Sequence, residues 1–158
     1  MTKKKAQQET SPKPASGDYR RFISGLQLVS IRLASASIRF SPDIYVAKRL
    51  PPFSFSLAAE LGEVSPKDFE ASQEAVVRAR ETTRSPILMS IKCKFTARYE
   101  TETQVNPEFF TVFKDTTLVI NVWPYIREFV QNCVVRAGLP PLTLPSQIYL
   151  PKQPNQDD

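Results

Sequence analysis

Histidine is absent from the 158 residues, and cysteine occurs only twice, at Cys93 and Cys133. Without histidine the chain lacks the usual general base and the usual Ser or Cys triads. The cysteines do not have the spacing of a metal site, and apolar neighbours such as Ile91, Phe95 and Val134 favour buried free thiols. No pair of acidic or lysine side chains stands out as a catalytic set. The sequence therefore predicts no enzyme, no metal and no cofactor.

Long apolar runs are also absent. A bilayer span needs roughly 20 apolar residues, and the basic start MTKKK is not followed by the apolar segment of a secretory signal. A content of 41% hydrophobic and 23% charged residues is typical of a globular protein of one domain. We therefore expect a cytoplasmic protein without membrane insertion.

The net charge of +5 is concentrated near the N-terminus. Residues 1–22 hold six basic and two acidic side chains, and the remainder holds 15 basic and 14 acidic ones. A nearly neutral body is poor evidence for nucleic-acid binding, which needs several phosphate contacts. Binding through Lys3–Lys5 remains a minor alternative. Polar, proline-containing segments at 1–18 and 151–158 predict disordered tails around one domain at 19–150.

Most of this domain has the period of two that is typical of strands. A long strand is predicted in LQLVSIRLASASIRFS, where a phase slip near Leu33 indicates a bulge or bend that reverses the buried face. Alternation also predicts strands in FSFSL, from Phe53, and in ILMSIKCKFTARY, from Ile87. FFTVF at 109–113 and LVINV at 118–122 complete an expected antiparallel sheet with one apolar face.

Two helices are predicted between and after these strands. Ser65-Pro66-Lys67-Asp68 has the features of a helix start, which predicts a helix to about Glu81. A second helix is expected to begin with Pro124 as its first residue and to end at Gly138. Its apolar stripe contains Ile126, Phe129, Val130, Cys133, Val134 and Ala137. A sheet with separate helices indicates the α+β class.

The second helix is more apolar than one-sided burial requires. Tyr125 and Val135 lie on its polar side, and Leu139, Leu142 and Leu144 continue the apolar surface beyond its end. These side chains suit the core of one chain, and they suit equally a subunit interface or the border of a groove.

The run Trp123-Pro124-Tyr125-Ile126-Arg127-Glu128-Phe129-Val130, followed by Arg136 and by Leu139-Pro140-Pro141-Leu142-Thr143-Leu144, resembles the helix signature of the SecB protein-export chaperones. Ala36 to Ser41 resembles the first strand of that family. The resemblance implies an α+β fold: a four-stranded antiparallel sheet packed with one long amphipathic helix, here with a short inserted helix. It also implies a homo-oligomer, a dimer of dimers, whose members hold unfolded polypeptides in hydrophobic grooves without ATP or a cofactor.

The chain departs from the export chaperones in its charge. Those proteins are acidic and use that acidity to dock the translocation ATPase, whereas this chain is basic and has only Glu100 around its predicted third strand. Ile126 and the exit Pro140-Pro141-Leu142-Thr143-Leu144 are more similar to SecB-like chaperones of toxin–antitoxin operons, whose client is an antitoxin.

The leading hypothesis is an ATP-independent holdase for unfolded or aggregation-prone polypeptides, with an antitoxin as one candidate client. The alternative is a dedicated adaptor of the same fold with a single cognate partner. Candidate client-binding residues are Ile44, Tyr45, Phe53, Phe55, Leu139, Leu142 and Leu144. Candidate oligomer-interface residues are Trp123, Tyr125, Arg127, Glu128 and Val135.

Overall fold

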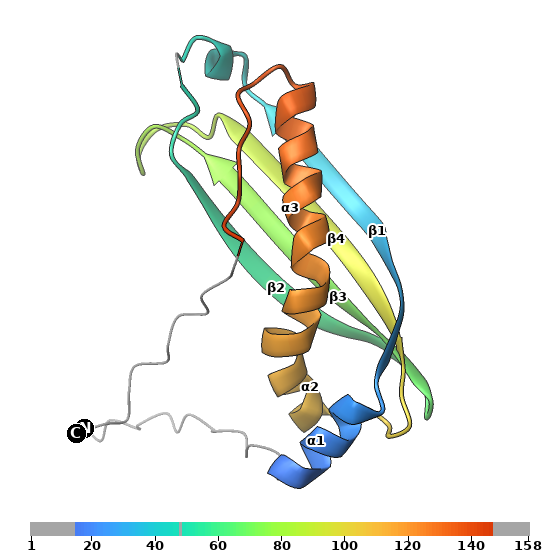
Figure 1. Cartoon of the computed structure of the whole chain (residues 1–158). Coiled ribbons are helices and arrows are strands. Elements are labelled where there is room, and N and C mark those ends of the chain that lie inside the picture. The colour runs from blue at the N-terminus through green and yellow to red at the C-terminus, as the bar shows by residue number, and fades with distance from the viewer. Residues whose placement is uncertain (1–14, 48, 147–158) are drawn as a thin grey trace, which may run out of the picture.

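The computed structural model describes residues 15–47 and 49–146 (Figure 1). Its elements in chain order are helix α1 (Ser16–Ser24), strand β1 (Gln27–Phe40), the 3-10 helix η1 (Pro42–Tyr45), strands β2 (Phe53–Val64), β3 (Asp68–Ala79) and β4 (Met89–Glu100), helix α2 (Pro107–Phe113), a π-helical turn η2 (Lys114–Leu118) and helix α3 (Val119–Arg136). The predicted tail 151–158 and most of the predicted tail 1–18 lie outside the described residues. Helix α1 begins at Ser16, inside the range predicted as the N-terminal tail. No helix in the described part of the chain is both long enough and apolar enough to cross a membrane.

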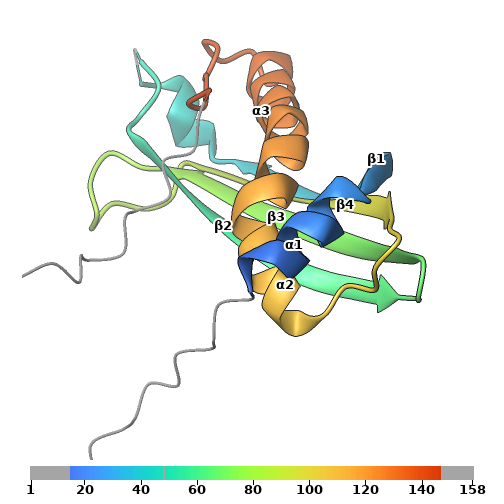
Figure 2. The ribbon, with the colours of Figure 1, turned by 60° about the horizontal axis from the view of Figure 1, so that its bottom comes forward.

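The four strands form one antiparallel sheet in the order β1-β4-β3-β2. Helix α3 crosses one face of this sheet, and α1 and α2 lie at one end of it (Figures 1 and 2). In the described part of the chain no helix covers the opposite face, which we call the outer face. The α+β class and the four-stranded antiparallel sheet with one long helix, predicted from the sequence, are confirmed.

Strand β1 contains the predicted bulge. The register pairs Leu33 with Phe95 and later Ile38 with Ile91, and Ala34 has no partner on β4. Because Phe95 and Ile91 both point to the α3 side, Leu33 and Ile38 do so as well. The bulge therefore keeps the apolar side chains of β1 on one face, and the predicted reversal of the buried face is wrong.

The helix predicted over residues 65–81 is also wrong, because this segment forms strand β3. The hydroxyl of Ser65 accepts a hydrogen bond from the backbone N–H of Asp68, at 3.0 Å, so it stabilises a turn between strands rather than a helix start. On β3 the residues Phe69, Ala71, Ala75, Val77 and Ala79 are fully buried towards α3. Three of these five are alanines, which have no strand preference, and they concealed the alternation. The short helix of the fold is α1 instead.

Residues 109–113 and 118–122, predicted as strands, are helical. The helical run begins with Pro107, where the Oδ1 of Asn106 accepts a hydrogen bond from the backbone N–H of Phe109 at 2.8 Å. It continues through η2 into α3, so Pro124 lies inside α3 and is not its first residue. Phe109, Phe113 and the apolar residues after them have strand-like propensity, but burial against the sheet determines their conformation.

The end of α3 agrees with the sequence. Gly138 has a φ of 77°, its N–H donates to the carbonyl of Val135 at 3.0 Å, and the N–H of Leu139 donates to the carbonyl of Val134 at 3.2 Å. These two bonds form a Schellman motif, which ends the helix and turns the chain back towards the sheet.

Aromatic side chains join the helices to the sheet at one end of the molecule. Phe113 is fully buried, and its ring centroid lies 5.1 Å from that of Tyr99 and 5.5 Å from that of Phe69. Phe22 of α1 stacks on Phe109 of α2 at 5.1 Å. Rings from α1, α2, β3 and β4 therefore form a single cluster, which attaches α1 to the domain.

Replacement of Phe113 by Ala should lower the free energy of unfolding by about 3–5 kcal/mol, because the cluster cannot close the resulting cavity. Urea denaturation followed by circular dichroism measures this change. Ile87→Ala is the matched control, since Ile87 is 44% exposed and its truncation should change stability by less than about 0.5 kcal/mol. Equal effects of the two substitutions would contradict this account of the core.

Candidate functional site

The segment that follows α3, residues 137–146, lies on the same face of the sheet as α3, between α3 and β2 (Figure 1). We call it the exit segment. Its leucines are buried: Leu139 is 9% exposed, Leu142 3% and Leu144 1%. Pro141 and Thr143 between them, and Pro145 after them, are exposed. The three leucines predicted as client contacts therefore belong to the core of the single chain.

Two side chains of α3 hold the exit segment in place. The Nε1 of Trp123 donates a hydrogen bond to the carbonyl of Pro145 at 2.9 Å, and the Nε of Arg127 donates one to the carbonyl of Leu144 at 3.1 Å. Trp123 is only 4% exposed. Within one chain, these two predicted interface residues thus position the exit segment.

The described residues between β1 and β2, 41–47 and 49–52, belong to a crossover segment near the end of α3 (Figure 1). Ile44 is 1% exposed and belongs to the core. Tyr45 is half exposed, and its hydroxyl donates a hydrogen bond to the carbonyl of Ala137 at 3.0 Å, which connects the crossover segment to the exit segment. Val46 beside it is 82% exposed.

Strand β2 presents a row of partly exposed apolar side chains on its α3 side. Register with β3 places Phe53, Phe55, Leu57, Ala59 and Leu61 on this face, and we call them the β2 strip. The ring of Phe55 contacts that of Trp123, with a centroid distance of 5.3 Å, whereas Phe53 is 39% exposed. Because β2 is an edge strand of the described sheet, the backbone N–H and carbonyl groups that point away from β3 do not pair with another strand of that sheet.

A cavity of about 340 Å³ lies beside this strip. It is bordered by Leu57, Ala59 and Gln73 on the sheet, and by Lys114 and Val119 from the π-helical turn and the start of α3. The amide nitrogen of Gln73 donates to the carbonyl of Ala58 at 3.0 Å, while its buried Oε1 has no hydrogen-bond partner among the described residues. The strip is therefore a hollowed apolar surface with a polar group in its wall.

A second apolar surface lies on the opposite side of α3. Leu28, Leu33 and Ile38 of β1 are 40–47% exposed, although they point to the α3 side of the sheet. Tyr125 of α3 continues this surface: it is 46% exposed, and its ring centroid lies 6.2 Å from that of Phe95 of β4. We call this the β1–α3 surface. Ile120, at 72%, and Val135, at 48%, are exposed elsewhere around the same helix. Tyr125 and Val135 were predicted to lie at an interface, and Glu128 is exposed on the same helix.

The thiols and charges show no reactive centre in the part of the chain that the structure describes. Burial raises the pKa of Cys93 to about 11, and burial also raises the pKa of Cys133, so both are protonated at neutral pH. The described residues contain no group of three or more His, Cys, Asp or Glu side chains that could hold a metal ion. The site is therefore defined by apolar surface.

The chain combines a four-stranded antiparallel sheet, one long helix and partly exposed apolar faces, and comparisons with known proteins find the same combination. No protein-family model matches the chain. Protein-export protein SecB of Nitrosomonas europaea is 25% identical over 120 residues, which cover 75% of this chain and 73% of that protein. A SecB-like chaperone of Mycobacterium tuberculosis, solved in complex with a ChAD peptide from the HigA1 antitoxin, has the same fold with a TM-score of 0.66 and 22% identity, covering 84% of this chain and 97% of that one. The resemblance to the SecB-like family is confirmed, in sequence by the first protein and in fold by the second.

Sequence reasoning missed several residues of both surfaces. Leu57 was placed on the apolar side of FSFSL but was not named as a site residue. Ala59 and Leu61 continue the same alternation, so a longer window would have included them. The β1 side chains were recognised as apolar. Their exposure was not predicted, because it depends on how much of the width of the sheet α3 covers. Ile120 was assigned to a strand, so its position on a helix surface was not considered.

Arg127→Met should lower the free energy of unfolding by about 1–2 kcal/mol, because it keeps the aliphatic stem but leaves the carbonyl of Leu144 without its charged donor. Urea denaturation measures the loss. Arg136→Met on the same helix is the control, since Arg136 is exposed in the last turn. A loss for Arg136→Met as large as that for Arg127→Met would show that the Arg127 bond does not hold the exit segment.

Proposed function

We propose that the protein is a holdase chaperone that binds extended, aggregation-prone polypeptides on the β2 strip without ATP. The observation that supports this function most directly is the row of partly exposed apolar side chains on an edge strand with free backbone groups. The similarity to the two chaperones supports the same class of function.

The strip suits an extended client for two physical reasons. Main-chain groups of the client can pair with the free edge of β2, while every second client side chain points to the α3 side. There it meets Phe53, Leu57 and the adjoining cavity, where burial of apolar area is favourable by about 25 cal/mol per Å². Recognition of this kind requires apolar side chains at alternate positions and little else in the client sequence.

We further propose that copies of the chain assemble through the β1–α3 surface. Exposed apolar surface on both a strand and a helix is typical of oligomer interfaces. The resemblance to the SecB-like family supports a dimer of dimers. Tyr125 is then an interface residue, with Glu128 and Val135 at the rim of the contact.

An antitoxin is one candidate client. The mycobacterial chaperone was solved with a peptide from an antitoxin, and the exit Pro140-Pro141-Leu142-Thr143-Leu144 is the feature of this chain that resembles that branch. The second candidate function is an adaptor with one cognate partner. It is favoured by the burial of Ile44 and of the three exit leucines, which narrows the client surface to the β2 strip. Competition separates the two functions, because unrelated unfolded peptides displace a client from a holdase but not a partner from an adaptor.

The purified chain should suppress aggregation of a chemically denatured test protein, measured by light scattering without ATP. Phe53→Ser should weaken suppression several-fold, because it removes the most exposed ring of the strip. Ile87→Ser, at a position of similar exposure in the link between β3 and β4, should retain full activity. Absence of suppression at a several-fold molar excess of the wild-type chain would rule out the holdase.

The wild-type chain should sediment as a species larger than the 17.9 kDa monomer. The double variant Ile38→Glu/Tyr125→Glu should shift it towards the monomer, because two carboxylates per chain buried at the interface oppose association. Ile87→Glu should leave the sedimentation coefficient unchanged. A wild-type chain that is monomeric at all concentrations tested would contradict the proposed assembly.

A further inference from the structure

The outer face of β3 changes its charge along the strand. Its outer residues begin with the carboxylates Asp68, Glu70 and Glu74 and end with the guanidinium group of Arg78, and Arg80 follows directly after the strand. The acidic end lies beside the β2–β3 turn, and the basic end lies where β2 begins, next to the crossover segment (Figure 1).

Four carboxylates on the outer face of the sheet already have cationic partners. Ion pairs join Arg32 to Glu70, Lys92 to Glu74, Lys94 to Glu60 and Arg98 to Asp68, with N–O distances of 2.8–3.2 Å. No such pair involves Arg78 or Arg80 within residues 15–47 and 49–146. The basic end of β3 therefore retains an excess positive charge.

A third arginine lies on the same end of the outer face. Ser90 of β4 pairs with Arg39 of β1 on one side and with Arg78 of β3 on the other. Arg39 and Arg78 are thus about 10 Å apart across the sheet, and Arg78 and Arg80 are about 7 Å apart along the strand. The residue between Arg78 and the free edge of β2 is Ser54, whose side chain is small.

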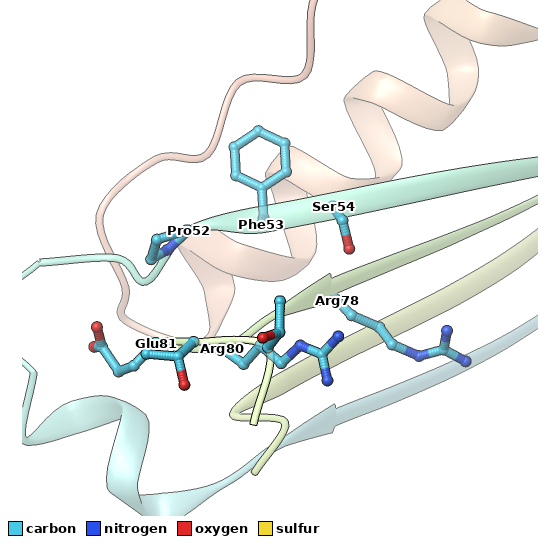
Figure 3. Close-up of a pocket in the computed structure, with 8 residues that line it drawn as sticks. Pro52, Phe53, Ser54, Arg78, Arg80 and Glu81 are labelled. Atoms are coloured by element: carbon cyan, nitrogen blue, oxygen red, sulfur yellow. The ribbon is translucent and has the colours of Figure 1, made fainter. Parts of the chain in front are cut away.

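Figure 3 shows that Arg78 and Arg80 lie near Phe53, the first residue of the β2 strip. A pocket of about 280 Å³ includes Phe53, Ser54, Arg78 and Arg80 in its lining. The ring of Phe53 projects to the side of α3 and the exit segment, whereas both guanidinium groups lie on the other side of β2. The carboxylate of Glu81, which also lines the pocket, points away from both of them. The start of β2 thus has an apolar side and a cationic side.

We propose that Arg78 and Arg80, assisted by Arg39, bind carboxylates of an acidic client segment while the β2 strip binds its apolar side chains. This inference rests on the proposed function and specifies the chemistry of its client. On a strand added to the edge of β2, outward side chains recur every 7 Å or so, which matches the spacing of the two arginines. Such a strand would lie two strand spacings, about 10 Å, from β3, and an arginine side chain and a client glutamate side chain together span this distance. The planar guanidinium group then forms paired hydrogen bonds with the carboxylate. The favoured client is therefore an extended segment in which apolar and acidic residues alternate.

The test measures the affinity of the full chain for two labelled peptides. One peptide alternates Phe or Leu with Glu, and the other has Gln in place of each Glu. The wild-type chain should bind the Glu peptide about tenfold more tightly, and Arg78→Glu/Arg80→Glu should abolish this preference. The control is Arg20→Glu/Arg21→Glu, at two exposed positions of α1, which changes the net charge by the same amount. It should leave the preference within about twofold, because α1 lies far from the start of β2. Fluorescence anisotropy measures all of these affinities.

Equal affinity of the wild-type chain for the Glu and Gln peptides, or equal losses in the two double variants, overturns the inference while leaving the holdase intact. Failure of the wild-type chain to bind either peptide overturns the proposed function together with the inference. Displacement of the Glu peptide by single-stranded oligothymidine of equal charge assigns the cluster to phosphates, and it also overturns the inference.

Discussion

A single helix is too narrow to cover a four-stranded sheet. Helix α3 with its side chains is about 10–12 Å across, whereas four strands spaced by about 4.8 Å have a greater breadth. Helix α3 therefore buries the central strands β4 and β3, whose α3-facing residues are almost all inaccessible, and leaves the edge strands β1 and β2 partly uncovered. Both apolar surfaces of the molecule follow from this mismatch.

The two edge strands, β1 and β2, differ in how far other segments of the chain cover their apolar side chains. On the β2 side the exit segment returns beside α3 and covers part of the strip, so that Phe55 is packed against Trp123 while Phe53 remains accessible. On the β1 side no described segment performs this role, and Leu28, Leu33 and Ile38 stay half exposed. One edge is thus a partly filled groove suited to a narrow extended chain, and the other is a broad face suited to a second protein surface.

The sequence predicted elements well where a single physical signal dominated. The strict alternation of residues 87–99 identified β4, and the glycine and prolines after residue 137 identified the end of α3. It failed where signals conflicted: the Ser65-Pro66 turn has the features of a helix start, and the phenylalanines of residues 109–113 have strand propensity on a helix. The site was harder to predict, because the same leucine pattern suits a core and a groove. Only the path of the exit segment shows that Leu142 and Leu144 face inwards, and only the breadth of the sheet shows that β1 is exposed.

The attachment of the exit segment has a consequence for how this protein can change over evolution. Both hydrogen bonds that anchor it, from Trp123 and Arg127, end on main-chain carbonyls. Any residue at position 144 or 145 supplies such an acceptor, so the anchor does not depend on which side chains stand there. The exposed positions Pro141, Thr143 and Pro145 alternate with the buried leucines on the exit segment, which lies between α3 and β2 (Figure 1). Substitutions at these positions can alter the border of the groove while the fold is retained, which allows the choice of client to diverge between relatives without a loss of stability.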